Sequence, residues 1–199
     1  MITKLKYGNT NTWLIRGPHG TILLDTDYAG TLPLFYKAIK KVQISIRDLS
    51  YILATHYHPD HMGIISDLMK EGVALLIMEP QIPYVHYSDG IFARDSRLKV
   101  SPIREEQAVQ LCCEESRSFL KKLGIDGEII STPSHSRDSI SLLLDSGACF
   151  VGDLQPREYL DGFPDDEQFR SDWENILTAH PSVIYYSHIP EQIVKPDHF

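Results

Sequence analysis

The sequence predicts an α/β protein, because short apolar runs typical of buried strands alternate with amphipathic helical segments along the chain. Several of these runs end in aspartate or histidine. In addition, the segment from Thr55 to Gly63 places three histidines and an aspartate within the six positions from His56 to His61. Together these observations predict a sheet whose strand ends carry a rigid metal site at one edge.

The first part of the chain alternates strands and helices, with turn residues between them. Gly17 and Gly20 lie between two β-prone runs, Pro33 falls in the first turn of a helical segment, and Gly72 ends another. The predicted elements are a hairpin of strands 13–16 and 21–25, a helix 31–42, a strand 49–55 that leads into the histidine cluster, a helix 62–71 and a strand 73–78.

Residues 79–102 interrupt this alternation with prolines and aromatic side chains. Long irregular segments in a compact domain usually serve a function or are disordered. We therefore predict a substrate-pocket loop here, in which His86 is either a ligand or substrate contact or an ordinary loop residue. Aromatic candidates for the pocket are Tyr57, Tyr84, Tyr159 and Phe163, although aromatic residues near a site more often serve in packing.

In the second part of the chain, the residue pattern predicts one long helix and then further strands. Gly124 follows the helical segment 104–123, and His135 lies in a turn after the strand 128–132. The remaining predicted elements are strands 139–144 and 148–151, a helix 166–179 and a strand 183–187. We expect residues 1–199 to form a single domain.

Composition narrows the function classes. The 199 residues are 42% hydrophobic and 23% charged, with a formal net charge of -8, so a nucleic-acid surface is not expected. No apolar run approaches the roughly 20 residues that span a bilayer, and the first residues lack an apolar signal core. The sequence therefore predicts a cytoplasmic protein that acts on a small molecule, and it makes no prediction of oligomeric state.

The histidine cluster has the residue types and spacing of a two-metal site. His56 and His58 are two positions apart, so in an extended segment they project to the same side. Pro59 opposes a helix before it, whereas Asp60 and His61 begin a helical segment. The backbone therefore turns between the pairs, and each pair can face a different metal ion. A purely structural role for the histidines is the alternative, and their close clustering argues against it.

Other strand ends supply further ligand-type side chains. Asp25, Asp153 and His188 each follow an apolar strand, as the histidine cluster does, and His135 lies in a turn after a fifth strand. Taken alone, Asp25 could equally be a turn or helix cap. His180 is a rival to His188, but it ends a helix and no strand leads to it.

From about Asn11 to Ile189 the chain resembles the metallo-β-lactamase-like hydrolase superfamily. The signature His-x-His-x-Asp-His is met by His56, His58, Asp60 and His61, and Asp25 matches the first motif. The resemblance implies a four-layer αββα sandwich with the site between the sheets. It also implies one metal on His56, His58 and His135, a second on Asp60, His61 and His188, and Asp153 as the bridging ligand.

The implied activity is metal-dependent hydrolysis of a small ester-type substrate, a thioester or lactone, by a metal-bridging hydroxide. Two divalent ions, zinc first and manganese or iron as alternatives, would lower the pKa of the shared water from about 15.7 towards 7. The catalytic roles fall to Asp60, which would orient the hydroxide, and to Asp25, which would hold a ligand. Asp153 is a carboxylate that β-lactamases generally lack.

The length suggests a glyoxalase II-like protein without that enzyme's helical substrate domain. The alternatives are a phosphodiesterase or nuclease, or a β-lactamase, and a non-catalytic metal-binding or redox module ranks last. The chain departs from the family pattern where Ser134, Ser187 and Ile189 replace glycines.

Overall fold

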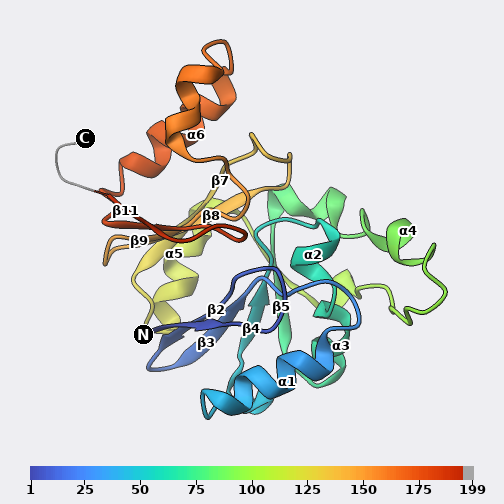
Figure 1. Ribbon diagram of the computed structural model, residues 1–199. Helices are drawn as coiled ribbons and strands as arrows, with labels where there is room; N and C mark the ends of the chain where they lie inside the picture. The colour runs from blue at the N-terminus through green and yellow to red at the C-terminus, as the bar shows by residue number, and fades with distance from the viewer. Residues whose placement is uncertain (195–199) are drawn as a thin grey trace.

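The computed structural model describes residues 1–194, which form two β-sheets with helices around them (Figure 1). The strands are β1 (Ile2–Leu5), β2 (Thr12–Gly17), β3 (Gly20–Leu24), β4 (Tyr51–Leu53), β5 (Ala74–Met78), β6 (Val109–Leu111), β7 (Gly127–Ser131), β8 (Ile140–Leu144), β9 (Ala148–Phe150), β10 (Val183–Tyr185) and β11 (Gln192–Ile193). The α-helices are α1 (Leu32–Lys41), α2 (Pro59–Met62), α3 (Ile65–Lys70), α4 (Asp89–Phe92), α5 (Cys113–Lys122) and α6 (Glu167–Leu177). Short 3-10 helices are η1 (Ile46–Asp48), η2 (Glu79–Tyr84), η3 (Glu105–Gln107) and η4 (Arg157–Gly162).

The first sheet follows the chain in the order β1-β2-β3-β4-β5-β6. Its first three strands are antiparallel, and β3, β4, β5 and β6 run parallel. Leu24 at the end of β3 pairs with Leu53 at the end of β4, so the segments that follow these two strands leave the sheet at the same edge. This edge receives Asp25 and the segment that carries His56.

The second sheet has the order β11-β10-β9-β8-β7. Within it, β9 and β10 are parallel, with Phe150 opposite Tyr185, so Asp153 and His188 emerge from neighbouring strands. The backbone N–H of Ile140, the first residue of β8, donates to the carbonyl of Thr55 at 2.9 Å. That bond joins the second sheet to the segment after β4, and it brings the site edges of the two sheets together.

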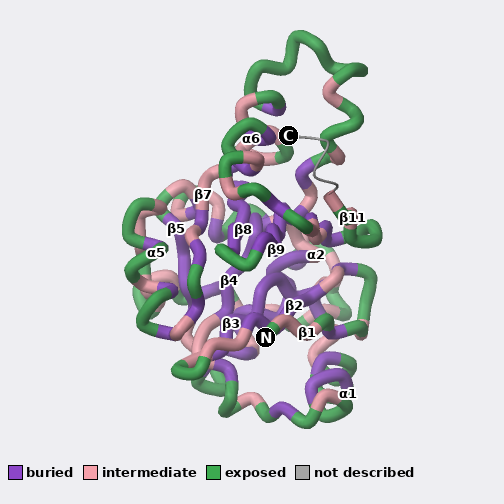
Figure 2. Tube along the Cα trace, turned by 90° about the vertical axis from the view of Figure 1, so that its left-hand side faces the viewer, coloured by how far each residue is buried: buried purple, intermediate pink, exposed green. Residues whose placement is uncertain are grey.

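Alternation along the strands decides which layer each face meets. In β3, Ile22 and Leu24 join an apolar cluster between the sheets, whereas Leu23 joins the cluster under α1 and α3. In β8, Leu142 faces the cluster between the sheets and Leu143 packs in the cluster with α6. The layers are therefore helix, sheet, sheet and helix, which confirms the predicted αββα sandwich (Figure 2, buried residues in purple).

Two predicted helices are wrong in extent. The expected helix 104–123 is divided into η3, the strand β6 and α5, because Val109 and Leu111 pair with β5 and extend the first sheet. The expected helix 62–71 is α2 and α3, separated at Gly63. The backbone N–H of Gly63 donates to the carbonyl of Asp27 at 3.0 Å, and Ile64 leaves the helical conformation with φ of -117° and ψ of 10°, so a bond to the segment after β3 replaces one within the helix.

The remaining differences are additions. The predicted loop 79–102 contains η2 and α4, and the strands β1 and β11 were not expected. In β1 and β11 the pairing with a neighbouring strand outweighs a weak local pattern. Within residues 1–194, no helix has the length and apolar character needed to cross a membrane.

Candidate metal centre

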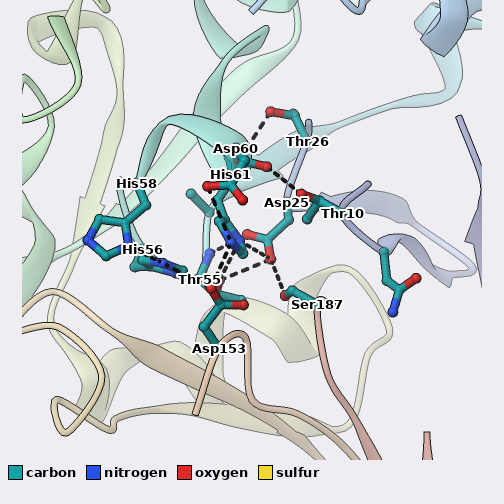
Figure 3. Close-up of polar contacts among 12 residues, drawn as sticks. Thr10, Asp25, Thr26, Thr55, His56, His58, Asp60, His61, Asp153 and Ser187 are labelled. Carbon is teal, nitrogen blue, oxygen red and sulfur yellow. Dashed lines mark hydrogen bonds and ion pairs between the residues drawn. The ribbon is translucent and has the colours of Figure 1, made fainter. Parts of the chain in front are cut away.

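Five chain segments meet at the edge where the two sheets come together, and each contributes a predicted site residue. Figure 3 labels the predicted site residues of three of these segments: Asp25, the histidine cluster and Asp153. Asp25 follows β3, the histidine cluster follows β4, His135 lies between β7 and β8, Asp153 follows β9 and His188 follows β10. The structure brings all seven predicted ligands together. They fall into three overlapping groups in which the ligand atoms lie within 4.8 Å of one another.

The first group is composed of imidazoles. We call His56, His58 and His135 the three-histidine group. Nε2 of His56 lies 3.0 Å from Nδ1 of His58, which lies 3.2 Å from Nε2 of His135. Three ring nitrogens therefore converge on one point.

The second group mixes imidazole and carboxylate. We call Asp60, His61 and His188 the acidic group. Nε2 of His188 lies 3.2 Å from Asp60 Oδ2, and Nε2 of His61 lies 4.0 Å from Asp60 Oδ1. His61 is fully buried, whereas Asp60 and His188 are each more than a third exposed. This group is consequently the one that opens to solvent.

Asp153 lies between the two groups. Its Oδ2 is 3.4 Å from Nε2 of His61, 3.8 Å from Nε2 of His135 and 3.9 Å from Nε2 of His56. Its Oδ1 is 3.4 Å from Nε2 of His188. The carboxylate thus faces one ring nitrogen of four histidines, two from each group.

Gly152 makes this position of Asp153 possible. It has φ of +61°, and a Cβ there would lie 2.7 Å from Oγ1 of Thr55. A larger residue would therefore be strained in conformation and would press against the segment that carries His56.

The donor set suits divalent metal ions. Imidazole and carboxylate together accept zinc, manganese or iron. Ligands about 2.0–2.1 Å from a tetrahedral ion lie about 3.3 Å apart, close to the separations of 3.0 to 3.4 Å found here. Nε2 of His61 and Oδ1 of Asp153 are buried and, within the described part of the chain, have no hydrogen-bond partner. Such buried polar atoms are rare unless a further group satisfies them, and a cation between them would do so.

Asp25 organises the deep side of the centre. It is 1% exposed and has φ of +57°, a left-handed conformation that aspartate tolerates better than most residues. Its Oδ1 accepts the backbone N–H of Thr55 at 2.6 Å. Its Oδ2 accepts from Oγ1 of Thr55 at 3.0 Å, from Oγ of Ser187 at 3.1 Å and lies 3.1 Å from Nδ1 of His61. One carboxylate therefore links both sheets.

These bonds determine which ring nitrogen faces the centre. When Nδ1 of His61 donates to Asp25, Nε2 is left facing Asp153. Thr55 donates its hydroxyl proton to Asp25, so its oxygen can accept from Nδ1 of His56, 3.1 Å away. Nε2 of His56 is then also free to act as a ligand, the arrangement that outer partners usually impose on metal-binding histidines.

The two groups have opposite electrostatics. Burial lowers the pKa of His56 and of His135, and nearby imidazoles add to this, while Asp153 opposes it. At His188, the carboxylates of Asp153 and Asp60, 3.4 and 3.2 Å from its Nε2, raise the pKa to about 10. Burial opposes the shift at His61, but Asp25 and Asp153 outweigh it and raise its pKa to about 10.

The carboxylates of the centre respond to the same contacts. Hydrogen bonding to His188 lowers the pKa of Asp60. Burial alone would raise the pKa of Asp153, but the imidazoles of His188 and His61, each 3.4 Å away, hold it far below the usual value. Both carboxylates are therefore ionised at neutral pH.

The predicted pocket residues separate into buried and exposed sets. Tyr57 is fully buried, so it cannot line a substrate pocket, and Tyr84 packs against the core on the outer face of the first sheet. Nδ1 of His86 lies 2.8 Å from Asp89 and His86 is in none of the ligand groups. Phe163 and Tyr159 are exposed, and Phe163 lines a cavity of about 190 Å³ together with His135.

Some residues that hold the site were not predicted from sequence. The buried carboxylate of Asp138 accepts the backbone N–H of Tyr57 at 2.6 Å, and that of Asp172 accepts the backbone N–H of Ser134 at 2.8 Å. Gln81 is also buried and donates to the carbonyl of Ala54 at 2.8 Å. These are contacts between distant segments, and no local pattern signals them. Ser187, noted only as a departure from glycine, is the donor to Asp25.

The two packed sheets and the histidine-rich edge define an αββα sandwich with a candidate metal centre. Residues 5–188 match the family model described as the Metallo-beta-lactamase superfamily. The chain therefore belongs to the metallo-beta-lactamase superfamily, as the resemblance predicted.

Similar proteins include the lactamase-like protein nscB of Trichophyton equinum, 30% identical over 146 residues, which are 72% of this chain and 37% of that protein. The atrochrysone carboxyl ACP thioesterase AacuM of Aspergillus aculeatus is 26% identical over 153 residues, or 75% of this chain and 41% of that one. The chain thus spans less than half the length of both relatives. An archaeal superfamily protein from Sulfolobus tokodaii has the same fold, with a TM-score of 0.70 and 16% identity over 96% of this chain and 81% of its own.

Proposed function

We propose that the chain is a hydrolase that uses two divalent metal ions, zinc by preference, to cleave a small ester-type substrate, a thioester or a lactone. The observation that carries this proposal is the place of Asp153, whose carboxylate lies between the three-histidine group and the acidic group. Two adjacent ligand sets that share one carboxylate suit a pair of ions.

The residues would divide the work in the following way. His56, His58 and His135 would hold one ion, Asp60, His61 and His188 the other, and Asp153 both. When bound, such ions acidify water and polarise the scissile carbonyl. Asp60 is ionised and partly exposed, so it can accept a hydrogen bond from the attacking water and orient it. Asp25 would keep His61 and, through Thr55, His56 in the ligand tautomer.

The surroundings of the centre favour an acyl substrate over a phosphodiester. The ring of Tyr87, which is 58% exposed, lies with its centroid 5.6 Å from that of His58. Phe163 is 51% exposed beside His135, and Ile189, next to His188, is 42% exposed. The exposed aromatic and aliphatic surfaces of these side chains contact an acyl chain well. The relative named a thioesterase supports the same class.

The test is a hydrolysis panel of thioesters, lactones, β-lactams and phosphodiesters, run on protein of measured metal content. We expect a thioester or lactone to be the best substrate and His58→Ala to lose the activity together with one metal equivalent. Activity on β-lactams or phosphodiesters alone would contradict the assignment of a thioester or lactone substrate. Unchanged activity in His58→Ala would refute the metal-dependent mechanism.

A further inference from the structure

His135, which is partly exposed, lacks the side-chain support that the buried histidines His56 and His61 have. Nδ1 of His61 faces Asp25 and Nδ1 of His56 faces Thr55, whereas nothing in residues 1–194 hydrogen-bonds Nδ1 of His135. The ring nitrogen Nε2 of His135 meets only other members of the centre. The position of this imidazole therefore depends on how the backbone of its loop is held.

Two buried carboxylates hold that loop from opposite ends. At one end, Asp138 belongs to the loop and accepts the backbone N–H of Tyr57, which lies between His56 and His58. At the other end, the backbone N–H of Ser134 donates to Oδ2 of Asp172 at 2.8 Å. Asp172 lies on α6, far from His135 in sequence, so the second anchor comes from the outer helical layer.

Asp172 is an unusual residue for its place. It is 0% exposed, and among the described residues no cationic side chain lies within ion-pair distance of it. Its second oxygen accepts from Nε2 of Gln168 at 2.8 Å, one turn earlier on the same helix. Burying a carboxylate is costly unless hydrogen bonds satisfy it, so a helix that only covered a sheet would be served better by an apolar residue.

The neighbouring residue on α6 strengthens this arrangement. Nε1 of Trp173 donates to the carbonyl of Gln155 at 3.0 Å, two residues after Asp153. Adjacent positions of α6 thus hold the loop of His135 and the segment that follows Asp153. These two segments bring His135 and Asp153 within 3.8 Å of each other.

We propose that Asp172 is a positioning residue for the metal centre: through the backbone of Ser134 it fixes His135 against His56 and His58, and so sets the metal affinity of the three-histidine group. This inference rests on the proposed metal-dependent function. The acidic group has its own support from Asp25, and Asp172 contacts none of its members. Loss of Asp172 should therefore weaken the binding of the ion at the three-histidine group and leave the binding of the other ion unchanged.

The experiment is a Zn²⁺ titration of metal-free protein against a competing chelator, with bound metal counted after dialysis. We expect two binding steps in the wild type. In Asp172→Ala one step should weaken by about 10- to 100-fold, the usual effect of losing an outer partner, while the other is unchanged. Asp172→Asn keeps an oxygen that can accept from Ser134, so it should recover most of the lost affinity.

A matched control lies on the same helix. Glu174→Ala removes a carboxylate from α6, as Asp172→Ala does, but at an exposed position. It should leave both Zn²⁺ steps in place. If Asp172→Ala does not fold, Asp172→Leu, which fills the buried face of the helix, takes its place.

The outcomes separate the two proposals. Two unchanged Zn²⁺ steps in folded Asp172→Ala or Asp172→Leu would overturn the positioning role, as would equal weakening of both steps. Two Zn²⁺ ions bound by wild-type protein without hydrolysis of any ester class would refute the proposed function, and the Asp172 comparison would still decide the positioning role. A wild type that binds no Zn²⁺ would overturn both.

Discussion

The three-histidine group and the acidic group lie on either side of Asp153, yet they would meet a metal ion in different protonation states. In the first, burial lowers the pKa of His56 and His135, so these rings are neutral at pH 7. In the second, carboxylates raise the pKa of His61 and His188 to about 10, so these rings are protonated. Desolvation dominates on one side and charge pairing on the other.

The comparison suggests an order of events. Neutral imidazoles bind a metal directly, whereas protonated ones must first lose a proton. Before metal binds, the protons on His61 and His188 compensate Asp60 and Asp153, which would otherwise repel each other. We therefore expect the first ion at the three-histidine group and the second at the acidic group, where it replaces protons as the counter-charge.

The largest effect should follow from removing the carboxylate that both groups share. Asp153→Ala should reduce hydrolysis by more than the about 10- to 100-fold seen for outer partners, because it removes a direct ligand of both ions. It should also weaken both Zn²⁺ steps. Asp145→Ala, which removes an exposed partner of Arg117, is the control and should leave rate and metal content unchanged. If only one Zn²⁺ step weakens in Asp153→Ala, the bridging role is wrong.

The next largest effect should come from Asp25, which contacts His61 directly and His56 only through Thr55. Oδ2 of Asp25 accepts hydrogen bonds from the side chains of Thr55 and Ser187 and faces Nδ1 of His61. Asp25→Asn replaces one carboxylate oxygen by an NH₂ group, so some of these buried donors lose their acceptor. We expect Zn²⁺ affinity at the acidic group to fall by about 10- to 100-fold, with a loss of unfolding free energy of about 1–3 kcal/mol for each unsatisfied group.

The matched control for this change is Asp27→Asn. Asp27 is also buried and accepts backbone N–H groups from Thr10 and Tyr28, but it belongs to no ligand group. It should reduce stability in chemical denaturation and leave Zn²⁺ binding intact. Equal metal affinity in the two variants would mean that Asp25 contributes only to folding.

The smallest expected effect is a difference in pH dependence between the two Zn²⁺ steps. Above pH 7 the first step should be nearly flat, since His56 and His135 have already lost their protons. The second should strengthen by about tenfold per pH unit for each proton released, up to the raised pKa of about 10 at His61 and His188. Calorimetric titrations in buffers of different ionisation enthalpy count the protons.

The same pKa shifts determine whether the stability of the metal-free protein rises or falls with pH. Because the folded pKa of His188 is raised, its contribution is full below its ordinary value near 6.5 and is lost as the pH rises towards about 10. Asp60 has a lowered pKa, so its contribution is present above its ordinary value near 3.8 and is lost in acid. Equal proton release in both Zn²⁺ steps would contradict this difference between the groups.

Several parts of the fold could be predicted because the signal is local. Short apolar runs identified β3, β4 and β8, and Thr31 with Pro33 marked the start of α1. The helix expected over 104–123 failed because the pattern around Val109 suits a helix or a strand, and the free edge of β5 decided between them. The helix expected over 62–71 is interrupted where the backbone N–H of Gly63 bonds to the carbonyl of Asp27, a contact that the sequence does not reveal.

The site divides in the same way. His56, His58, Asp60 and His61 are recognisable because they are close in sequence, and Asp25, Asp153 and His188 because each follows an apolar strand. By contrast, Asp172 reaches Ser134 across 38 positions and Asp138 reaches Tyr57 across 81. The sequence alone determined the ligand types and the strands that carry them, since spacing and periodicity are properties of neighbouring residues. Only the tertiary structure decided which nitrogen of each ring faces the centre, which histidines are protonated, and which buried carboxylates hold the loops, because these depend on distance and burial in the folded chain.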